Sequence, residues 1–350
     1  MSPDAAPPIA RAIALLATGD HLGEQLAAEA FGQLMGGEAT AAQAAALLMG
    51  LRVKGENAAE VAGAVRALRG AMVRVDAPMD RPLIDTCGTG GGVIPTFNVS
   101  TAAAVVAVAA GARVAKHGNR SYTTKCGSAD VIEALGIPAN LEAAPAARAL
   151  REQGLVFLFA PLYHPAMRFV IPVRRELAIG TIMNVIGPLA NPAGVRRQVV
   201  GVADAARGPV LAEALAMLGS EHALVVHARV GMDEIAPSGP TGVWEVTGRE
   251  VRTWELDPAD YGLRHDGLQA LKGGDPAQNA ARVRRLFADP ASDPAGRATV
   301  ALNAGAAVYV AGMAASTAEG MQAAVAALDD GGAAAALERL VTAGGVNTSS

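Results

Sequence analysis

From residue 83 onward, short apolar runs of β type alternate with stretches that have helical spacing, and this alternation restricts the fold more than any other feature. The β-type runs lie at residues 83–86, 113–116, 156–159, 199–202 and 223–227. Helical stretches lie near 100–110, 128–135 and 209–218, each followed by a glycine: Gly111, Gly136 and Gly219. This pattern predicts an α/β fold in which helices flank a mostly parallel central sheet. In such sheets, ligands bind beyond the carboxyl ends of the strands.

The first 75 residues show helical spacing and no β-type alternation. Two helical patterns there begin with residue pairs at the spacing of a capping box, Thr40 with Gln43 and Asn57 with Glu60. We therefore predict a small all-helical N-terminal domain over residues 1–75, joined by part of 165–190. A larger α/β domain is predicted over residues 80–345, and its Ala-rich segment 303–341 is expected to form packing helices.

Net charge limits which partners the chain can bind, and cysteine content indicates where in the cell it is found. The 350 residues include 29 Lys and Arg against 33 Asp and Glu, which gives a formal net charge of −4. This mild acidity argues against nucleic acid or an anionic membrane as the main partner, so any anion site must be local. Cys87 and Cys126 provide no disulfide framework, and no apolar stretch reaches the roughly 20 residues of a membrane span. We expect a cytoplasmic protein with no membrane or nucleic-acid partner.

Residues 85–101 form a glycine-rich loop between a predicted strand and a predicted helix. Glycines at 88, 90, 91 and 92 let the backbone approach a ligand closely and turn its N–H groups towards an anion. Asn98, Ser100 and Thr101 then open the helix, whose N-terminus adds unpaired N–H donors and a positive dipole end. The loop suits a phosphate or pyrophosphate, and a merely tight turn is the alternative interpretation.

Residues 116–128 form a second polar loop in the same strand-to-helix position. Lys116, Arg120 and Lys125 are suited to neutralise a polyphosphate, and Asn119 to orient a second substrate. The loop itself contains no acidic residue, which favours a binding function over a solvated turn. Ser128 is expected to be the N-cap of the helix that follows.

Asp233 and Glu234 follow the last of the predicted strands. Adjacent acids in a loop are usually just solvated, but near a pyrophosphate their hard oxygen ligands indicate Mg²⁺. His164 and Arg174 lie in two further polar segments, and Arg174 is suited to bind a carboxylate through two hydrogen bonds. For both residues an ordinary structural role is the alternative.

The remaining conspicuous residues are interpreted as structural. Gly187-Pro188 and the turn Asn191-Pro-Ala-Gly194 are interpreted as residues that set the path of the chain. Cys87 and Cys126 are interpreted as small packing side chains and not as catalytic thiols. The sequence contains no Cys and His cluster with the spacing of a zinc site.

Taken together, these segments resemble the anthranilate phosphoribosyltransferase family. The matching pieces are, in chain order, Gly88-Thr-Gly-Gly91, Asn98-Val-Ser-Thr101, Lys116-His-Gly-Asn-Arg120, Gly127-Ser-Ala-Asp130, His164-Pro-Ala-Met167, Pro172-Val-Arg-Arg-Glu-Leu177, Asn184, Gly187-Pro-Leu189, Asn191-Pro-Ala-Gly194, Val226-His227 and Asp233-Glu234. The resemblance implies transfer of the phosphoribosyl group of 5-phosphoribosyl 1-pyrophosphate to the amine of anthranilate. The products would be N-(5-phosphoribosyl)anthranilate and pyrophosphate, as a step of L-tryptophan biosynthesis. It also implies a homodimer with an active site between the two domains of each chain.

The resemblance implies three groups of site residues. Those for 5-phosphoribosyl 1-pyrophosphate are Gly88, Thr89, Gly91, Gly92, Thr96, Asn98, Val99, Ser100, Thr101, Lys116, His117, Gly118, Asn119, Arg120, Ser121, Tyr122, Thr123, Thr124 and Ser128. Those for anthranilate are Gly88, His117, Asn119, His164 and Arg174. Two Mg²⁺ ions are implied at Ser100, Asp233 and Glu234. No residue is assigned as catalytic, because positioning and charge stabilisation carry the implied reaction.

Two positions depart from the family pattern. Gly92 stands where the family usually has Asp, and Tyr122-Thr-Thr124 replaces smaller residues. Two alternatives also stay open here. One is an enzyme similar to pyrimidine nucleoside phosphorylases, which share the two-domain plan but use phosphate and a nucleoside. The other is a non-catalytic relative that binds nucleic acid, against which the acidic charge and the nearly complete motifs argue.

Overall fold

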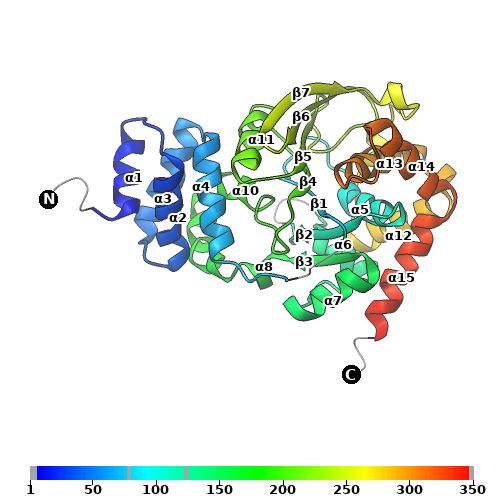
Figure 1. The fold of residues 1–350 in the computed structure, drawn as a ribbon, viewed down its shortest axis with the longest axis horizontal. Helices are drawn as coiled ribbons and strands as arrows, with labels where there is room; N and C mark the ends of the chain where they lie inside the picture. Colours follow the sequence, from blue (N-terminus) through cyan, green and yellow to red (C-terminus); the bar gives the residue numbers. More distant parts are fainter. Residues whose placement is uncertain (1–5, 77–79, 122–124, 347–350) are drawn as a thin grey trace.

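The computed structural model of the chain describes residues 6–76, 80–121 and 125–346, with a seven-stranded sheet at its centre (Figure 1). The strand order is β3-β2-β1-β4-β5-β6-β7. The strands are β1 Leu83–Gly88, β2 Arg113–Gly118, β3 Leu155–Phe159, β4 Arg197–Gly201, β5 His222–Ala228, β6 Thr241–Thr247 and β7 Glu250–Leu256. Strands β1 to β5 pair in parallel, and β6 and β7 add antiparallel pairs at one edge. The predicted mostly parallel sheet is confirmed.

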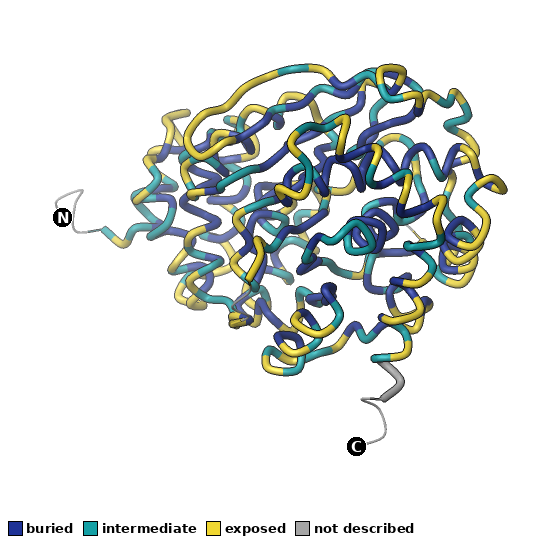
Figure 2. Tube along the Cα trace, turned by 45° about the vertical axis from the view of Figure 1, so that its right-hand side comes forward, coloured by how far each residue is buried: buried dark blue, intermediate teal, exposed yellow. Residues whose placement is uncertain are grey.

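Successive residues of the strands face two different helical layers. In β4 and β5, Val199 and Leu224 belong to one core, whereas Val200 and Val225 belong to the other. The first core is covered by α5 Val99–Ala109, α12 Pro276–Ala288, α13 Pro294–Val310, α14 Thr317–Asp329 and α15 Gly332–Val346. The second is covered by α11 Arg207–Met217 and the N-terminal helices, and α7 Ala143–Gln153 packs on β3. The buried segments run through the centre of the molecule in Figure 2. Burial on both faces explains why the strands read as continuous apolar runs.

An all-helical bundle lies on one side of the sheet (Figure 1). Its helices are α1 Pro8–Ala17, α2 Glu24–Gly36, α3 Ala41–Lys54 and α4 Ala58–Gly70. Helices α3 and α4 begin at the two predicted capping boxes, which are confirmed. Three later segments pack into the same core, the 3₁₀ helix Pro165–Phe169, α9 Ile171–Leu177 and α10 Met183–Ile186. The bundle therefore draws on two distant parts of the chain.

The path of the chain brings the loops after the strands together. From β1 the chain proceeds outwards to β3 and then returns to β4 on the other side of β1, so that Gly88 and Gly201 pair at the carboxyl ends of their strands. Ligands of open α/β sheets bind at such a reversal of strand order. The polar segments after β1, β2, β3 and β5 all start from this edge of the sheet.

Several elements were not indicated by the sequence analysis. The β6–β7 hairpin turns through Gly248 and Arg249, and Gly248 has a φ of +62°. Its sequence signal is a two-residue turn that begins with glycine and lies between two runs of residues typical of strands. Helices α7 and α12 were also missed. The smaller elements α8 Ala160–Tyr163 and the 3₁₀ helices Pro258–Tyr261, Leu268–Leu271 and Pro290–Ser292 were not indicated either, whereas α6 Ser128–Ala134 confirms the helix predicted near 128–135.

Other local predictions agree with the structure. Gly111, Gly136 and Gly219 have φ of +96°, +79° and +80°, the left-handed conformation predicted for them at helix ends.

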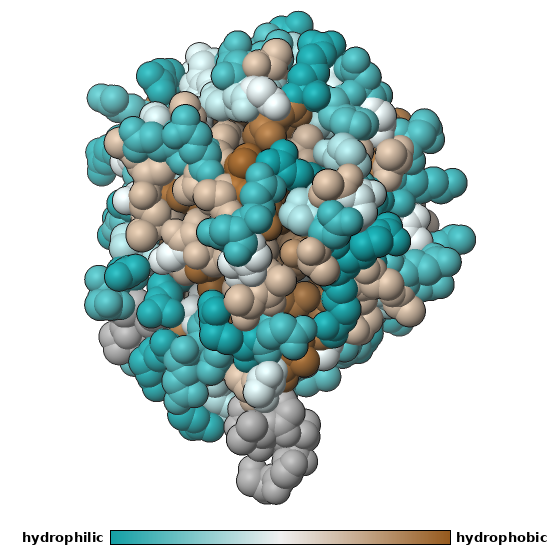
Figure 3. Space-filling model, turned by 90° about the vertical axis from the view of Figure 1, so that its right-hand side faces the viewer, coloured by the Kyte–Doolittle hydropathy of each residue, from teal (hydrophilic) through white to brown (hydrophobic). Residues whose placement is uncertain are grey.

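No helix within the described ranges has the length and apolar character needed to cross a bilayer. On the face formed by α14 and α15, hydrophobic residues are scattered in small groups among hydrophilic ones (Figure 3).

Candidate active site

The glycine-rich loop forms a turn that is closed by Asp233. Gly90 and Gly91 have φ of +69° and +86°, a conformation that side chains rarely adopt. The N–H of Gly90 donates to Asp233 Oδ2 at 2.9 Å, and the N–H of Thr89 donates to the Gly201 carbonyl at 2.9 Å. A Cβ on Gly201 would lie 1.6 Å from the Asp233 carbonyl oxygen, so only glycine permits this approach. The turn after β1 and the acidic segment after β5 are thus in contact, although far apart in sequence.

The two acids lie in an environment that favours their protonated forms. Burial raises the pKa of Asp233, and burial together with Asp233 raises the pKa of Glu234 to about 8. Thr96 Oγ1 donates to Glu234 Oε2 at 3.0 Å, which ties the end of the glycine-rich loop to the acid pair. On α13, Asn303 holds the next residue, Ile235, by accepting from its N–H at 3.0 Å and donating to its carbonyl at 2.9 Å.

Lys116 is buried at the end of β2 and connects the first loop to the sheet. Its Nζ donates to the Thr86 carbonyl at 2.5 Å and to Ser100 Oγ at 3.2 Å. Burial lowers the pKa of Lys116, while the charge of Asp85 opposes that effect. The ammonium group therefore fixes the Ser100 hydroxyl at the start of α5 and adds a positive charge beneath the site.

Asp85 and Asn191 form a buried support that the sequence analysis did not identify. Asn191 Nδ2 donates to Asp85 Oδ2 at 2.8 Å and to the Ala115 carbonyl at 2.7 Å, and the N–H of His117 donates to Asp85 Oδ1 at 3.2 Å. Burial raises the pKa of Asp85 to about 6. The N–H of Ala193 donates to Asn191 Oδ1 at 2.9 Å, which agrees with the interpretation of this segment as a turn, and the amide of Asn191 also joins β1 to β2 below the two loops.

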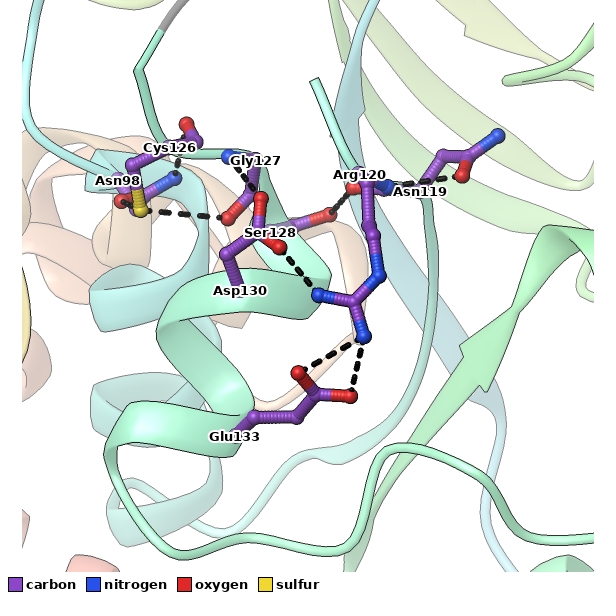
Figure 4. Close-up of polar contacts among 8 residues, drawn as sticks. All are labelled: Asn98, Asn119, Arg120, Cys126, Gly127, Ser128, Asp130 and Glu133. Atoms are coloured by element: carbon purple, nitrogen blue, oxygen red, sulfur yellow. Dashed lines mark hydrogen bonds and ion pairs between the residues drawn. The ribbon is translucent and has the colours of Figure 1, made fainter. Parts of the chain in front are cut away.

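The second loop differs from its prediction in two respects (Figure 4). The guanidinium of Arg120 donates to Asp130 Oδ1 at 2.5 Å and to Glu133 at 2.7 and 2.9 Å. Acidic residues on α6 therefore balance part of the positive charge of this loop. The predicted N-cap is also wrong: Gly127 is the N-cap of α6, and Asp130 accepts from its N–H at 2.8 Å. A Cβ at position 127 would lie 2.3 Å from the Ser121 backbone nitrogen, so the cap position has no room for a serine.

Ser128 has a different role from the one predicted. Its Oγ donates to the Asn119 carbonyl at 3.2 Å and joins the two ends of the second loop (Figure 4). Gly118 leaves room for this hydroxyl, since a Cβ there would lie 2.2 Å from Ser128 Oγ. The predicted residues Tyr122, Thr123 and Thr124 lie outside the described residues.

His117 and His164 form a buried pair next to the loops. Their ring centroids are 5.0 Å apart. Burial lowers the pKa of His117 to about 3 and that of His164 to about 4, so both rings are neutral at pH 7. Within the described part of the chain, His117 Nε2 and both ring nitrogens of His164 have no hydrogen-bond partner. Buried polar atoms of this kind indicate a ligand or water that completes the site.

The remaining predicted residues differ in their burial and in the hydrogen bonds that they already make. Asn119 Oδ1 accepts from the Arg120 N–H at 2.7 Å, and Arg174 is half-buried in the last turn of α9. Val99 and Thr101 are buried in the first turn of α5, and their backbone N–H groups donate to the carbonyls of Phe97 and Asn98 at 2.6 and 3.1 Å. Burial raises the pKa of the Cys87 thiol well above its usual value and that of Cys126 to about 11, which keeps both thiols protonated.

The residues predicted to hold magnesium fit that role. Within the described ranges, no group of three or more His, Cys, Asp and Glu side chains is arranged to hold a metal by itself. Asp233, Glu234 and Ser100 supply hard oxygen ligands, and Mg²⁺ in proteins commonly binds through one or two carboxylates, with water and substrate phosphates as its other ligands. Burial is the main cause of the raised pKa values of both acids, and a bound cation would favour their ionised forms.

The chain is similar to known proteins over most of its length. Residues 80–334 match a family described as "Glycosyl transferase family, a/b domain", and residues 10–72 match "Glycosyl transferase family, helical bundle domain". The chain is 49% identical over 341 residues to the anthranilate phosphoribosyltransferase of Roseiflexus castenholzii, covering 97% of this chain and 99% of that protein.

Solved structures extend the similarity to three dimensions. The crystal structure of anthranilate phosphoribosyltransferase from Thermus thermophilus has a TM-score of 0.89 at 42% identity, covering 96% of this chain and 99% of that one. The Saccharomyces cerevisiae enzyme in complex with phosphoribosyl pyrophosphate and Mg has a TM-score of 0.86 at 25% identity, covering 99% and 100%. These similarities extend over the whole length of the chain, which therefore belongs to the anthranilate phosphoribosyltransferase family.

Proposed function

We propose that this chain transfers the phosphoribosyl group of 5-phosphoribosyl 1-pyrophosphate to the amine of anthranilate and releases pyrophosphate, as a step of tryptophan biosynthesis. The observation that carries this proposal is the contact between the glycine turn at Gly88–Gly92 and the acid pair Asp233-Glu234 at the reversal of strand order. Family membership over the whole chain supports the same reaction. It also argues against the nucleoside phosphorylase and nucleic-acid alternatives.

Departure of pyrophosphate is the difficult step, because negative charge develops on it as the bond to the ribose C1 breaks. The backbone N–H groups of Gly91, Gly92 and Ser100 would donate to that charge from fixed positions. Lys116 adds a buried positive charge and orients the Ser100 hydroxyl. Mg²⁺, when bound by Ser100, Asp233, Glu234 and the substrate, would neutralise part of the charge on the leaving group.

The nucleophile needs positioning more than activation. An aryl amine is neutral at pH 7 and carries a free lone pair, so the reaction requires no dedicated base. The neutral imidazoles of His117 and His164 would contact anthranilate without binding its carboxylate as ion pairs. Arg174 and Asn119 would hold the carboxylate so that the amine faces the ribose C1.

The finer assignments form part of the same proposal. Phosphoribosyl pyrophosphate would contact the two loops and Ser128, and anthranilate would contact Gly88, His117, Asn119, His164 and Arg174. We propose a helical domain over residues 1–75 with part of 165–190, an α/β domain over residues 80–345, a homodimer, two Mg²⁺ ions and a cytoplasmic location. Packing of α9 and α10 against the N-terminal helices supports the discontinuous helical domain.

The proposal is tested by following anthranilate fluorescence with purified protein, Mg²⁺ and phosphoribosyl pyrophosphate. We expect a decay that needs all three components and stops when EDTA is added. A folded protein that gives no decay, but cleaves a pyrimidine nucleoside in phosphate buffer, would establish the phosphorylase alternative instead.

A further inference from the structure

Asn98 occupies the N-cap position of α5 without capping that helix. An Asn at this position normally accepts a hydrogen bond from the backbone N–H two or three residues on, here Ser100 or Thr101. In this chain, the Asn98 side chain makes no capping hydrogen bond. The first turn of α5 therefore keeps its N–H groups uncapped by a side chain, at the end of the helix that faces the glycine turn.

Two other side chains hold the Asn98 oxygen away from the helix. Asn279 Nδ2, from α12, donates to Asn98 Oδ1 at 3.0 Å, and Cys126 Sγ donates to the same oxygen at 3.2 Å. Asn98 Nδ2 in turn donates to the Cys126 carbonyl at 3.4 Å (Figure 4). The amide of Asn98 is thus bound on both of its ends by groups outside α5.

Asn279 is itself fixed in one orientation. It is only 3% exposed, and its Oδ1 accepts from the Gly274 N–H at 2.7 Å. With its oxygen committed to Gly274, its NH₂ group points to Asn98. Helix α12 is distant in sequence from both loops, and neither the site prediction nor the family motifs quoted above include Asn279.

We propose that Asn279 is a positioning residue for phosphoribosyl pyrophosphate: it holds the Asn98 side chain off the N-terminus of α5 and leaves the Ser100 N–H there for the substrate. The N–H groups of Thr101 and Ala102 already donate to the Asn98 carbonyl at 3.1 Å. The inference rests on the proposed function and extends it to a residue outside the two loops. Without the Asn279 donor, Asn98 Oδ1 can rotate towards the Ser100 N–H and compete with the substrate for it.

Asn279→Asp tests this role selectively, because it keeps the acceptor for Gly274 and removes the donor to Asn98. We expect the Kd and KM for Mg²⁺–phosphoribosyl pyrophosphate to rise about tenfold, the change that corresponds to one lost hydrogen bond. The KM for anthranilate should stay within about twofold, because no anthranilate contact is affected. The matched control is Asp275→Ala, which removes the capping box of α12 one turn away and does not touch Asn98. It should lower the melting temperature without changing the Kd.

A double variant separates positioning from general support of the fold. If Asn279 acts through Asn98, then Asn279→Asp adds no further loss of affinity to Asn98→Ala, because the competing side chain is already absent. Losses that add in the double variant would overturn the proposal, as would an unchanged Kd in Asn279→Asp.

Two further outcomes are distinguishable. If Asn279→Asp does not fold, as judged by circular dichroism, Cys126→Ala removes the other donor to Asn98 Oδ1. It must then raise the Kd in the same selective way. If the unmodified protein binds no Mg²⁺–phosphoribosyl pyrophosphate in calorimetry, the proposed function itself fails, and the inference fails with it.

Discussion

At the scale of single residues, Gly92 shows how one missing side chain changes the site. A Cβ at this position would lie 2.9 Å from Asp233 Oδ1 and 3.2 Å from the Gly231 carbonyl. Asp233 occupies the space that a side chain at position 92 would need, and it uses that position to accept from Gly90. The family pattern has Asp at this position, and here the carboxylate of Asp233 lies beside the place where the Cβ of such a residue would be.

Gly92→Ala is expected to raise the KM for phosphoribosyl pyrophosphate several-fold, because the methyl group pushes Asp233 off the Gly90 N–H. Gly92→Asp causes the same displacement but returns the acidic contact of the family pattern. It should therefore bind the magnesium-bound substrate more tightly than Gly92→Ala does. Steady-state kinetics of both variants over a range of Mg²⁺ concentrations checks this order, and equal KM values would show that the added carboxylate has no role.

Arg174 offers a second test at this scale. Loss of a guanidinium that binds the anthranilate carboxylate should raise the KM for anthranilate about 10- to 100-fold in Arg174→Ala, with a much smaller change for phosphoribosyl pyrophosphate. Arg175→Ala is the matched control, because Arg175 is the exposed neighbour on the same helix. Similar anthranilate KM values in the two variants would remove Arg174 from the site.

At the scale of elements, Glu245 joins three strands to a helix. Its carboxylate accepts from Arg252 Nη2 at 2.8 Å, Trp254 Nε1 at 2.9 Å and Tyr309 OH at 2.8 Å, and lies 2.9 Å from His222 Nε2. The bond to His222, followed by those to the other partners, lowers the pKa of Glu245 from 4.5 to about 2. The network fixes the antiparallel edge of the sheet to α13.

A pH dependence of stability follows from this pKa. Because the folded-state value is lowered, the stabilisation is fully present above pH 4.5 and is lost as the pH falls towards 2. Glu245→Gln should lower the free energy of unfolding by about 3 kcal/mol at pH 7, and the difference should shrink between these pH values. Urea denaturation across that range measures it, with the exposed Glu250→Gln as control. A difference that is independent of pH would contradict the assignment.

The elements also show what the sequence could and could not predict. Short apolar runs located β1 to β5, and glycines located the ends of α5, α6 and α11, because these signals are local. The motifs located both loops and the acid pair. Asp85, Asn191, Asn279 and Asn303 were not found, because each acts through a partner remote in sequence. The wrong N-cap at Ser128 has the same cause, since the space at Gly127 is limited by Ser121, from the other end of the loop.

At the scale of the whole molecule, Arg69 on α4 joins the two distant parts of the chain that build the helical bundle, since Leu189 follows α10. Its Nε and Nη2 donate to the Leu189 carbonyl at 2.9 and 2.6 Å, and burial, followed by the nearby Arg66 and Arg74, lowers its pKa to about 10. Arg69→Met keeps most of the packing but leaves that carbonyl without these donors. It should cost about 2 kcal/mol in the free energy of unfolding.

Chemical denaturation of Arg69→Met beside Arg52→Met checks this cost. Arg52 is exposed on α3, so its replacement controls for the change in charge and should have little effect. Equal unfolding free energies for the two variants would show that the contact with Leu189 contributes nothing to joining the parts.

The discontinuous bundle also has a consequence for how the protein is made. Helices α1 to α4 are synthesised before other parts of their core, which include Val170, Val173 and Ile186 and reach β4 and β5 through Val200 and Val225. The apolar surface that these later residues cover therefore stays open until translation has passed β5. During synthesis, this surface of the bundle is open to aggregation before the substrate loops exist as a site.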